Sequence, residues 1–145
     1  MSRTAIVLAA GLGTRMKSRK PKVLHHVMDA PMLEWVLDAT LRVVDHAVVV
    51  VGHGKADVES FLADTYGGKV STAHQVEQKG TGDAVKAALS KLPTAASTVL
   101  VLGADTPLLT ADTLQNLLDE HQCGGEHASV TILTTHLENP SGYGR

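Results

Sequence analysis

The sequence predicts an α/β fold in which a mostly parallel sheet carries helices on both faces. Short apolar segments rich in Val, Leu and Ile alternate with longer segments of helical periodicity. Because parallel neighbours need a crossover connection, this alternation is typical of a Rossmann-like domain. The chain has 145 residues, enough for one domain with a core of its own, and we expect residues 1–145 to form a single unit.

Two strands and two helices are expected in the first half of the chain. Residues 4–8 are apolar on both sides, as in a strand buried on both faces, and residues 46–51 contain four consecutive valines. Between these strands, Pro31 starts a helical pattern. A second helix is expected over residues 56–66, where the glycine pair that follows would end it. The apolar side of the first helix is expected to comprise Met32, Trp35, Val36, Ala39 and Val43.

The second half of the chain continues the alternation. Residues 70–73 are predicted to form a short strand, and the apolar run at 98–102 is the clearest remaining strand. A helix is expected over 81–92, and another from a capping threonine at position 110 to about position 121. Residues 128–133 alternate apolar and polar side chains and are predicted to form a further strand.

The composition excludes several classes of protein. Thirteen basic and fifteen acidic residues give a net charge of -2, so the chain lacks the basic surface that binds nucleic-acid backbones, and we expect no nucleic-acid partner. Cys123 is the only cysteine, so no disulfide can form within the chain. The first apolar run ends at Gly11, too early for a signal peptide or a membrane span. We therefore expect a cytoplasmic protein without membrane contact.

A glycine-rich turn follows the first predicted strand. Gly11 and Gly13 let the backbone turn sharply and approach a ligand closely, and successive N–H groups in such a turn bind anions. Arg15 and Lys22 carry the positive charge that pairs with phosphate oxygens. The spacing is neither that of a dinucleotide-binding glycine motif nor that of a P-loop. A tight turn without a ligand, flanked by solvated cations, therefore explains these residues equally well.

A carboxylate, Asp105, lies just beyond the predicted strand 98–102. Ligands of parallel α/β sheets bind beyond the carboxyl ends of the strands, and Mg²⁺ prefers oxygen ligands. A metal site at this position is one interpretation. The other is a turn, because Asp and the nearby Pro107 are both common turn residues, and the residues alone do not decide between the two.

Several segments together resemble the sugar-1-phosphate nucleotidyltransferases. They are L-A-A-G-L-G-T-R-M at 8–16, P-K-V-L at 21–24, Q-V-E-Q-K-G-T-G at 75–82, D-T-P-L at 105–108 and P-S-G-Y-G-R at 140–145. Their order is similar to that in the uridylyltransferase domain of the bifunctional bacterial N-acetylglucosamine-1-phosphate uridylyltransferases. The resemblance implies a nucleotidyltransferase fold and transfer of UMP from UTP to N-acetylglucosamine 1-phosphate. The products would be pyrophosphate and UDP-N-acetylglucosamine, a precursor of peptidoglycan and lipopolysaccharide.

The resemblance also implies a role for individual residues. Arg15 and Lys22 are expected to act in catalysis, at the departing pyrophosphate and at the α-phosphate. Asp105 is expected to hold Mg²⁺, and Gln75 to read uracil, since an amide offers both a donor and an acceptor. The implied substrate-binding residues are Leu8, Ala9, Ala10, Gly11, Gly13, Thr14, Lys22, Gln75, Gly80, Thr81, Gly103, Ala104, Asp105 and Gly142.

The chain departs from the family pattern in two respects. The family usually places glycine immediately before the metal-binding aspartate, whereas Ala104 stands here after Gly103, and a methyl group pointing into the site would crowd the nucleotide or the sugar phosphate. The family domain also continues well beyond position 145. The resemblance therefore implies a nucleotidyltransferase domain that is incomplete at its C-terminus and lacks much of the sugar half of its site. It also implies an oligomer for the full-length family protein.

Two other hypotheses stay open. A related nucleotidyltransferase, such as a molybdenum-cofactor guanylyltransferase, shares the first loop and the aspartate, but the segment at 75–82 and the ending at 140–145 argue against it. The third hypothesis is a nucleotide-binding module without transfer activity. Preference among UTP, GTP and CTP, and release of pyrophosphate, separate the three.

Overall fold

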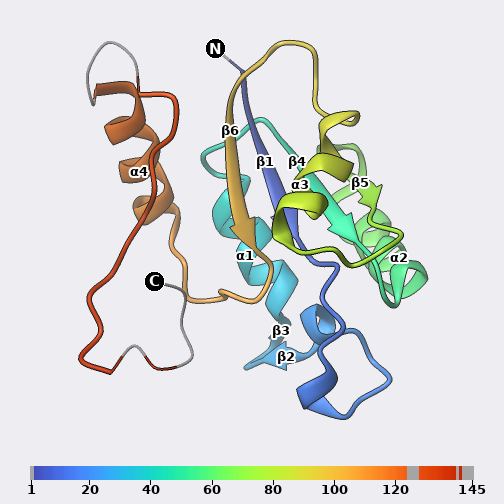
Figure 1. Cartoon of the computed structure of the whole chain (residues 1–145). Coiled ribbons are helices and arrows are strands. Elements are labelled where there is room, and N and C mark those ends of the chain that lie inside the picture. The colour runs from blue at the N-terminus through green and yellow to red at the C-terminus, as the bar shows by residue number, and fades with distance from the viewer. Residues whose placement is uncertain (1, 124–127, 140, 142–145) are drawn as a thin grey trace.

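A computed structural model of the chain describes residues 2–123, 128–139 and 141. A four-stranded parallel sheet forms its centre, with the strand order β5-β4-β1-β6 (Figure 1). The strands are β1 (Ser2–Leu8), β4 (His46–Val51), β5 (Val70–His74) and β6 (Ala96–Gly103). The predicted α/β fold with a parallel sheet is confirmed, and the second predicted strand, 46–51, has the observed bounds.

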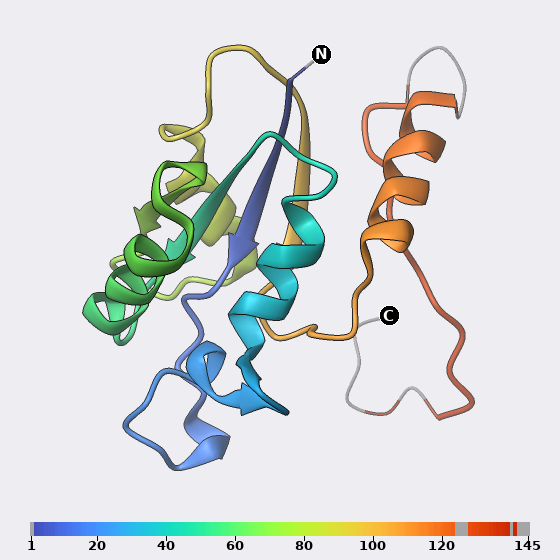
Figure 2. The same cartoon turned by 180° about the vertical axis from the view of Figure 1, so that it is seen from behind.

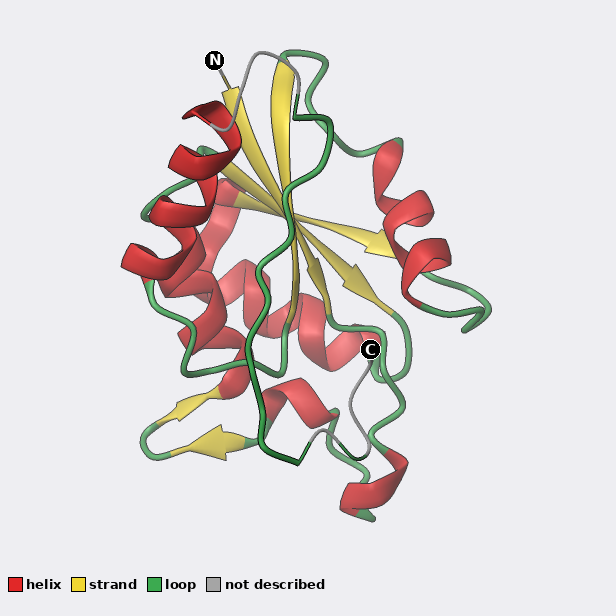
Figure 3. Ribbon diagram, turned by 60° about the vertical axis from the view of Figure 1, so that its left-hand side comes forward, coloured by secondary structure: helices red, strands yellow, loops and turns green. Residues whose placement is uncertain are grey.

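Helices cover both faces of the sheet, as predicted (Figure 3). The helices are α1 (Met32–Thr40), α2 (Lys55–Tyr66), α3 (Thr81–Leu89) and α4 (Ala111–Cys123). The first two lie in front of the sheet in Figure 2, and α3 lies in front of it in Figure 1. Alternate residues of β4 divide the core, since Val49 and Val51 pack on the α1 and α2 side while Val48 and Val50 pack on the α3 side. Both faces of β4 are buried, which explains its unbroken run of valines.

The apolar side predicted for α1 is correct only in part, because Val36 is buried and Ala39 and Val43 pack against the core but Trp35 does not. The buried residues of this helix are Leu33, Val36, Leu37 and Thr40. Trp35 is instead 38% exposed, and its Nε1–H donates to the carbonyl oxygen of Val27, 3.0 Å away. The indole packs beside a hairpin that the sequence analysis did not predict, formed by β2 (His26–Val27) and β3 (Ala30–Pro31).

The predicted strand at 128–133 is also wrong. These residues form no strand and run back beside α4, where Nδ1 of His121 lies 2.9 Å from the hydroxyl of Thr131 (Figure 1). Val130 and Ile132 are about three-quarters exposed. Their alternation suits a strand, but a strand needs a hydrogen-bonded neighbour, and within the described residues the segment has none.

The edge strand β6 contacts a neighbouring strand on one side only, where it pairs with β1. Within the part of the chain that the structure describes, no strand pairs with its other edge. Val99 and Val101 on this strand are 40% and 47% exposed. An apolar cleft of about 700 Å³ separates the strand from α4 and residues 129–133.

The remaining elements are short. Three 3₁₀ helices, η1 (Thr14–Met16), η2 (Lys22–Leu24) and η3 (Gly67–Lys69), lie in connections. The helix predicted over 81–92 ends at Leu89. Thr110 caps α4 as predicted, because its hydroxyl accepts the N–H of Thr113 at 3.2 Å. Among the described residues, no helix has the length and apolar character needed to cross a membrane.

Candidate nucleotide-binding site

The carboxyl ends of the parallel strands open onto a cavity of about 780 Å³. Ligands of such sheets bind at this edge, where loops from different strands converge. The predicted site residues that line the cavity are Leu8, Ala9, Ala10, Gly11, Gly13, Thr14, Arg15, Lys22, Gln75, Gly80, Thr81, Gly103 and Asp105. They come from three loops that are distant in the sequence, after β1, after β5 and after β6.

The loop after β1 turns at Gly13. This residue has φ +58°, the left-handed region that favours glycine, and a Cβ there would lie 2.8 Å from Cβ of Lys22. Gly11 lines the cavity, and a Cβ there would meet no atom within 4 Å. The short helix η1 follows and carries Arg15 on the cavity wall. The local sequence therefore lets the backbone pass close to Lys22 at one glycine and exposes backbone to a ligand at the other.

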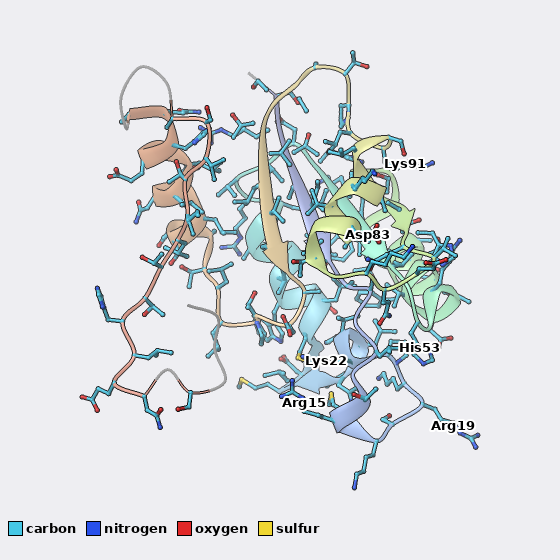
Figure 4. All side chains as sticks on the ribbon, in the orientation of Figure 1. Arg15, Arg19, Lys22, His53, Asp83 and Lys91 are labelled. Carbon is cyan, nitrogen blue, oxygen red and sulfur yellow. The ribbon has the colours of Figure 1, made fainter. Side chains whose placement is uncertain are left out.

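A second glycine holds the far end of this loop. Gly54, at φ +69°, caps α2, and the space that a Cβ would need is filled by Pro21. The next residue, Lys22, begins η2, in which Val23 and Leu24 are buried. The backbone of Lys22 is thus anchored on both sides, while its side chain lines the cavity. Figure 4 shows Lys22 and Arg15 at the same end of the domain.

The side chains of Lys22 and Asp105 form an ion pair. Nζ of Lys22 donates to Oδ2 of Asp105 at 2.7 Å, and the two side chains are 35% and 48% exposed. Gly103 leaves room for this carboxylate, since a Cβ there would lie 2.8 Å from Oδ1. The turn that carries Asp105 is held by the hydroxyl of Thr106, which donates to the Gly103 carbonyl oxygen at 2.9 Å. Asp105 thus lies in a turn and also lines the cavity, and its role as a metal ligand stays a prediction.

Ala104 lies in the core and does not line the cavity. Its exposed fraction is 0%, and it packs in the cluster on the α1 and α2 side of the sheet. Its N–H donates to the carbonyl oxygen of Leu8 at 3.0 Å, which fixes the chain as it leaves β6. The expectation that the methyl group of Ala104 crowds a bound nucleotide is therefore wrong, as is direct contact between this residue and substrate. Gly142 lies outside the described residues.

Gln75 is 5% exposed and is held by its own loop. Its side-chain nitrogen Nε2 donates to the Gly80 carbonyl oxygen at 3.1 Å and to Oδ2 of Asp83 at 2.8 Å. These two bonds use both amide hydrogens, so the oxygen Oε1 is the group left to face a ligand. The predicted combination of a donor and an acceptor is reduced to an acceptor.

Gln78 was not predicted to take part in the site. It lines the cavity, and its Nε2 donates to the carbonyl oxygen of Ala10 across 68 positions of sequence. This bond ties the loop after β5 to the loop after β1. The available signal was its place three residues after Gln75 in the segment at 75–82, because both glutamines are on a loop that follows a strand. Four further lining residues outside the predicted set are Leu12, Met16, Val23 and Ala84.

The chemistry of the donors fits a small hard cation only in part. Asp105 supplies one carboxylate, and no group of three or more His, Cys, Asp or Glu side chains that would hold a metal occurs among the described residues. Mg²⁺ is commonly held by one or two carboxylates together with substrate phosphates. The donor set therefore fits Mg²⁺ if a polyphosphate supplies the other oxygen ligands.

Comparison of the sequence with known proteins places the chain in one family of nucleotidyltransferases. The model of the MobA-like NTP transferase domain matches residues 5–143. Bifunctional protein GlmU of Enterococcus faecalis is 50% identical over 145 residues, which are 99% of this chain and 30% of that protein. GlmU of Sorangium cellulosum is 45% identical over 146 residues, which are 98% of this chain and 31% of that protein. The chain thus spans about a third of the length of these curated relatives.

Solved structures with the same fold are more distant in sequence. Rv0371c of Mycobacterium tuberculosis superposes with a TM-score of 0.68 at 25% identity, over 84% of this chain and 61% of that one. The 4-diphosphocytidyl-2C-methyl-D-erythritol synthase of Anaerococcus prevotii has a TM-score of 0.69 at 19% identity, over 83% and 51%. A complex of Rv0371c with manganese is also similar, with a TM-score of 0.64 at 22% identity.

Proposed function

Because this chain belongs to the MobA-like NTP transferase family and is related to GlmU, we propose that it forms the nucleotide half of a uridylyltransferase site. The reaction would transfer UMP from UTP to N-acetylglucosamine 1-phosphate, in the cytoplasm, and release pyrophosphate. The observation that carries the proposal is the single cavity that joins Arg15, Lys22, Gln75 and Asp105. These residues come from three separate loops, and each has a chemical task in nucleotidyl transfer.

The nucleophile in this reaction is a phosphate oxygen that is already an anion, so the protein needs no strong general base. It must hold two polyanions in line and neutralise their charge. The backbone around Gly11 accommodates the triphosphate because no side chain intervenes. Arg15 and Lys22 place positive charge beside the phosphates, where it balances the charge that moves onto the leaving pyrophosphate.

Asp105 would hold Mg²⁺, which would neutralise charge on the substrate phosphates when it is bound. The backbone that carries this carboxylate is held by the turn at Gly103 and Thr106. Gln75 supports uracil recognition through Oε1, because uracil presents an N–H between its two carbonyl groups and that N–H needs an acceptor. Its own N–H groups stay engaged by Gly80 and Asp83, which hold the amide in place.

Nucleotide titrations test the proposal. We expect UTP with Mg²⁺ to bind more tightly than GTP or CTP, and Asp105→Asn to remove the dependence on Mg²⁺. Asp112→Asn is the matched control, since it removes the same charge on the exposed start of α4. A preference for GTP would contradict uridylyl transfer and favour a guanylyltransferase.

A second assay separates transfer from binding. Pyrophosphate release is measured with UTP, Mg²⁺ and N-acetylglucosamine 1-phosphate. UTP binding without release would contradict transfer activity in this chain and favour a nucleotide-binding module. Asp105 is the last of the described residues that line the cavity. The assay therefore tests whether the chain also binds the sugar phosphate, for which these residues provide only part of a site.

A further inference from the structure

The ion pair between Lys22 and Asp105 joins the two groups that the proposed function assigns to different ligands. Lys22 is assigned to a phosphate and Asp105 to a divalent cation. Their 2.7 Å contact means that each group is neutralised by the other before any ligand binds. Among the described residues, the basic side chains on the cavity wall are Arg15 and Lys22, and the carboxylate there is Asp105. The ion pair therefore neutralises one of the two cations and the carboxylate.

The surroundings of the pair restrict both partners. The backbone of Lys22 is anchored by Gly13 on one side and by the buried Val23 of η2 on the other. The carboxylate of Asp105 lies against Gly103 in a closed turn. Among the described residues, the other ion pairs lie outside this cavity, at Lys55–Glu59 and Lys79–Glu77. The pair between Lys22 and Asp105 is thus the ion pair of the described residues that lies in the cavity.

We propose that Lys22 and Asp105 exchange partners on binding, so that a divalent cation and a nucleotide triphosphate bind cooperatively. This inference rests on the proposed function. When Asp105 turns to a cation, the Lys22 ammonium is released for a phosphate; when Lys22 turns to a phosphate, the carboxylate is released for a cation. Either ligand alone leaves one charged group without a partner, whereas the two together satisfy both. The coupling is reciprocal, because linkage requires the same factor in both directions.

The two single-ligand affinities of Lys22→Met should change in opposite directions. Mn²⁺ alone, titrated by calorimetry without nucleotide, should bind the variant about two- to fivefold more tightly than the wild type, since an exposed ion pair is worth that much. UTP in excess EDTA should bind it more weakly, because the variant lacks the cation that would take the phosphate. Lys20→Met removes the same charge two positions away, outside the cavity wall, and should leave the Mn²⁺ affinity unchanged.

Asp105→Asn provides the reciprocal measurement. It should abolish tight Mn²⁺ binding and strengthen the binding of UTP in EDTA by about two- to fivefold, since Lys22 is freed. Asp112→Asn should leave the binding of UTP in EDTA at the wild-type value. The side chains of Lys22 and Asp105 are both partly exposed, so we expect both variants to fold, and unchanged thermal unfolding of each variant checks this.

The exchange is overturned if Lys22→Met binds Mn²⁺ no more tightly than the wild type, or if Asp105→Asn binds UTP in EDTA no more tightly. Failure of the proposed function has a different result. If the protein prefers GTP, uridylyl transfer is contradicted, and the same titrations with GTP still decide the exchange. If no nucleotide binds, both are contradicted.

Discussion

Gly13→Ala tests how the loop after β1 depends on one backbone conformation. A non-glycine residue in the left-handed region costs about 1–2 kcal/mol. The new Cβ would also lie 2.8 Å from Cβ of Lys22, so the two segments would have to separate by about 0.6 Å to reach the 3.4 Å at which ordinary contact begins. We expect the midpoint of thermal unfolding to fall by about 3–8 °C. UTP binding should weaken as well, because Lys22 is displaced with the loop.

Gly11→Ala is the matched control in the same loop. Gly11 lines the cavity, and its Cβ would meet no protein atom within 4 Å. We therefore expect unchanged thermal unfolding, measured by circular dichroism, together with weaker UTP binding, measured by calorimetry. The two variants differ in stability but share the binding defect. An equal loss of stability in both, or none in Gly13→Ala, would refute the assignment of strain and close contact to Gly13.

Three other substitutions test interactions outside the loop. Gly54→Ala should destabilise the protein by about 1–2 kcal/mol in urea unfolding, because φ is +69° and Pro21 occupies the space; full stability would contradict this packing. Thr110→Ala should cost about 1 kcal/mol through loss of the α4 cap, and Thr110→Ser should restore most of it. Burial, followed by the hydrogen bond to Asp38, raises the pKa of Tyr66 above its ordinary value of about 10. Stability should therefore be complete below about pH 10 and fall above it, as the unfolded tyrosine ionises first; an unchanged pH profile in Tyr66→Phe would contradict this.

The elements that the sequence predicts best are those whose residues respond to one dominant environment. Residues 46–51 form a strand that is buried on both faces, so the apolar run in the sequence has the same bounds as the strand. Trp35 was wrongly placed on the buried side of α1 because it is large and apolar, yet its N–H is held by the Val27 carbonyl of a hairpin too short to show a periodicity. The segment 128–133 has the alternation of a strand, but alternation cannot reveal whether a neighbouring strand exists.

The cavity was predicted more completely than the interactions inside it. Residues on separate loops could be grouped because parallel strands deliver their carboxyl ends to one edge. Hydrogen bonds between side chain and backbone carry no such pattern. The bond from Gln78 to the Ala10 carbonyl and the two bonds that engage the amide of Gln75 therefore appear only in three dimensions. The burial of Ala104 could not be predicted either, because its position in the motif does not indicate whether its methyl group points into the core or into the site.

The outer edge of β6 affects how the protein behaves at high concentration. An edge strand with free backbone groups and exposed valines is a template on which another extended chain can add. Val99 and Val101 lie on that edge, beside the exposed Val130 and Ile132. Self-association through this strand would increase with protein concentration and would bury the outer edge of β6. Ligand titrations are therefore best run dilute, and Val101→Lys, which places a charge on the edge, should raise the concentration at which the protein stays monodisperse.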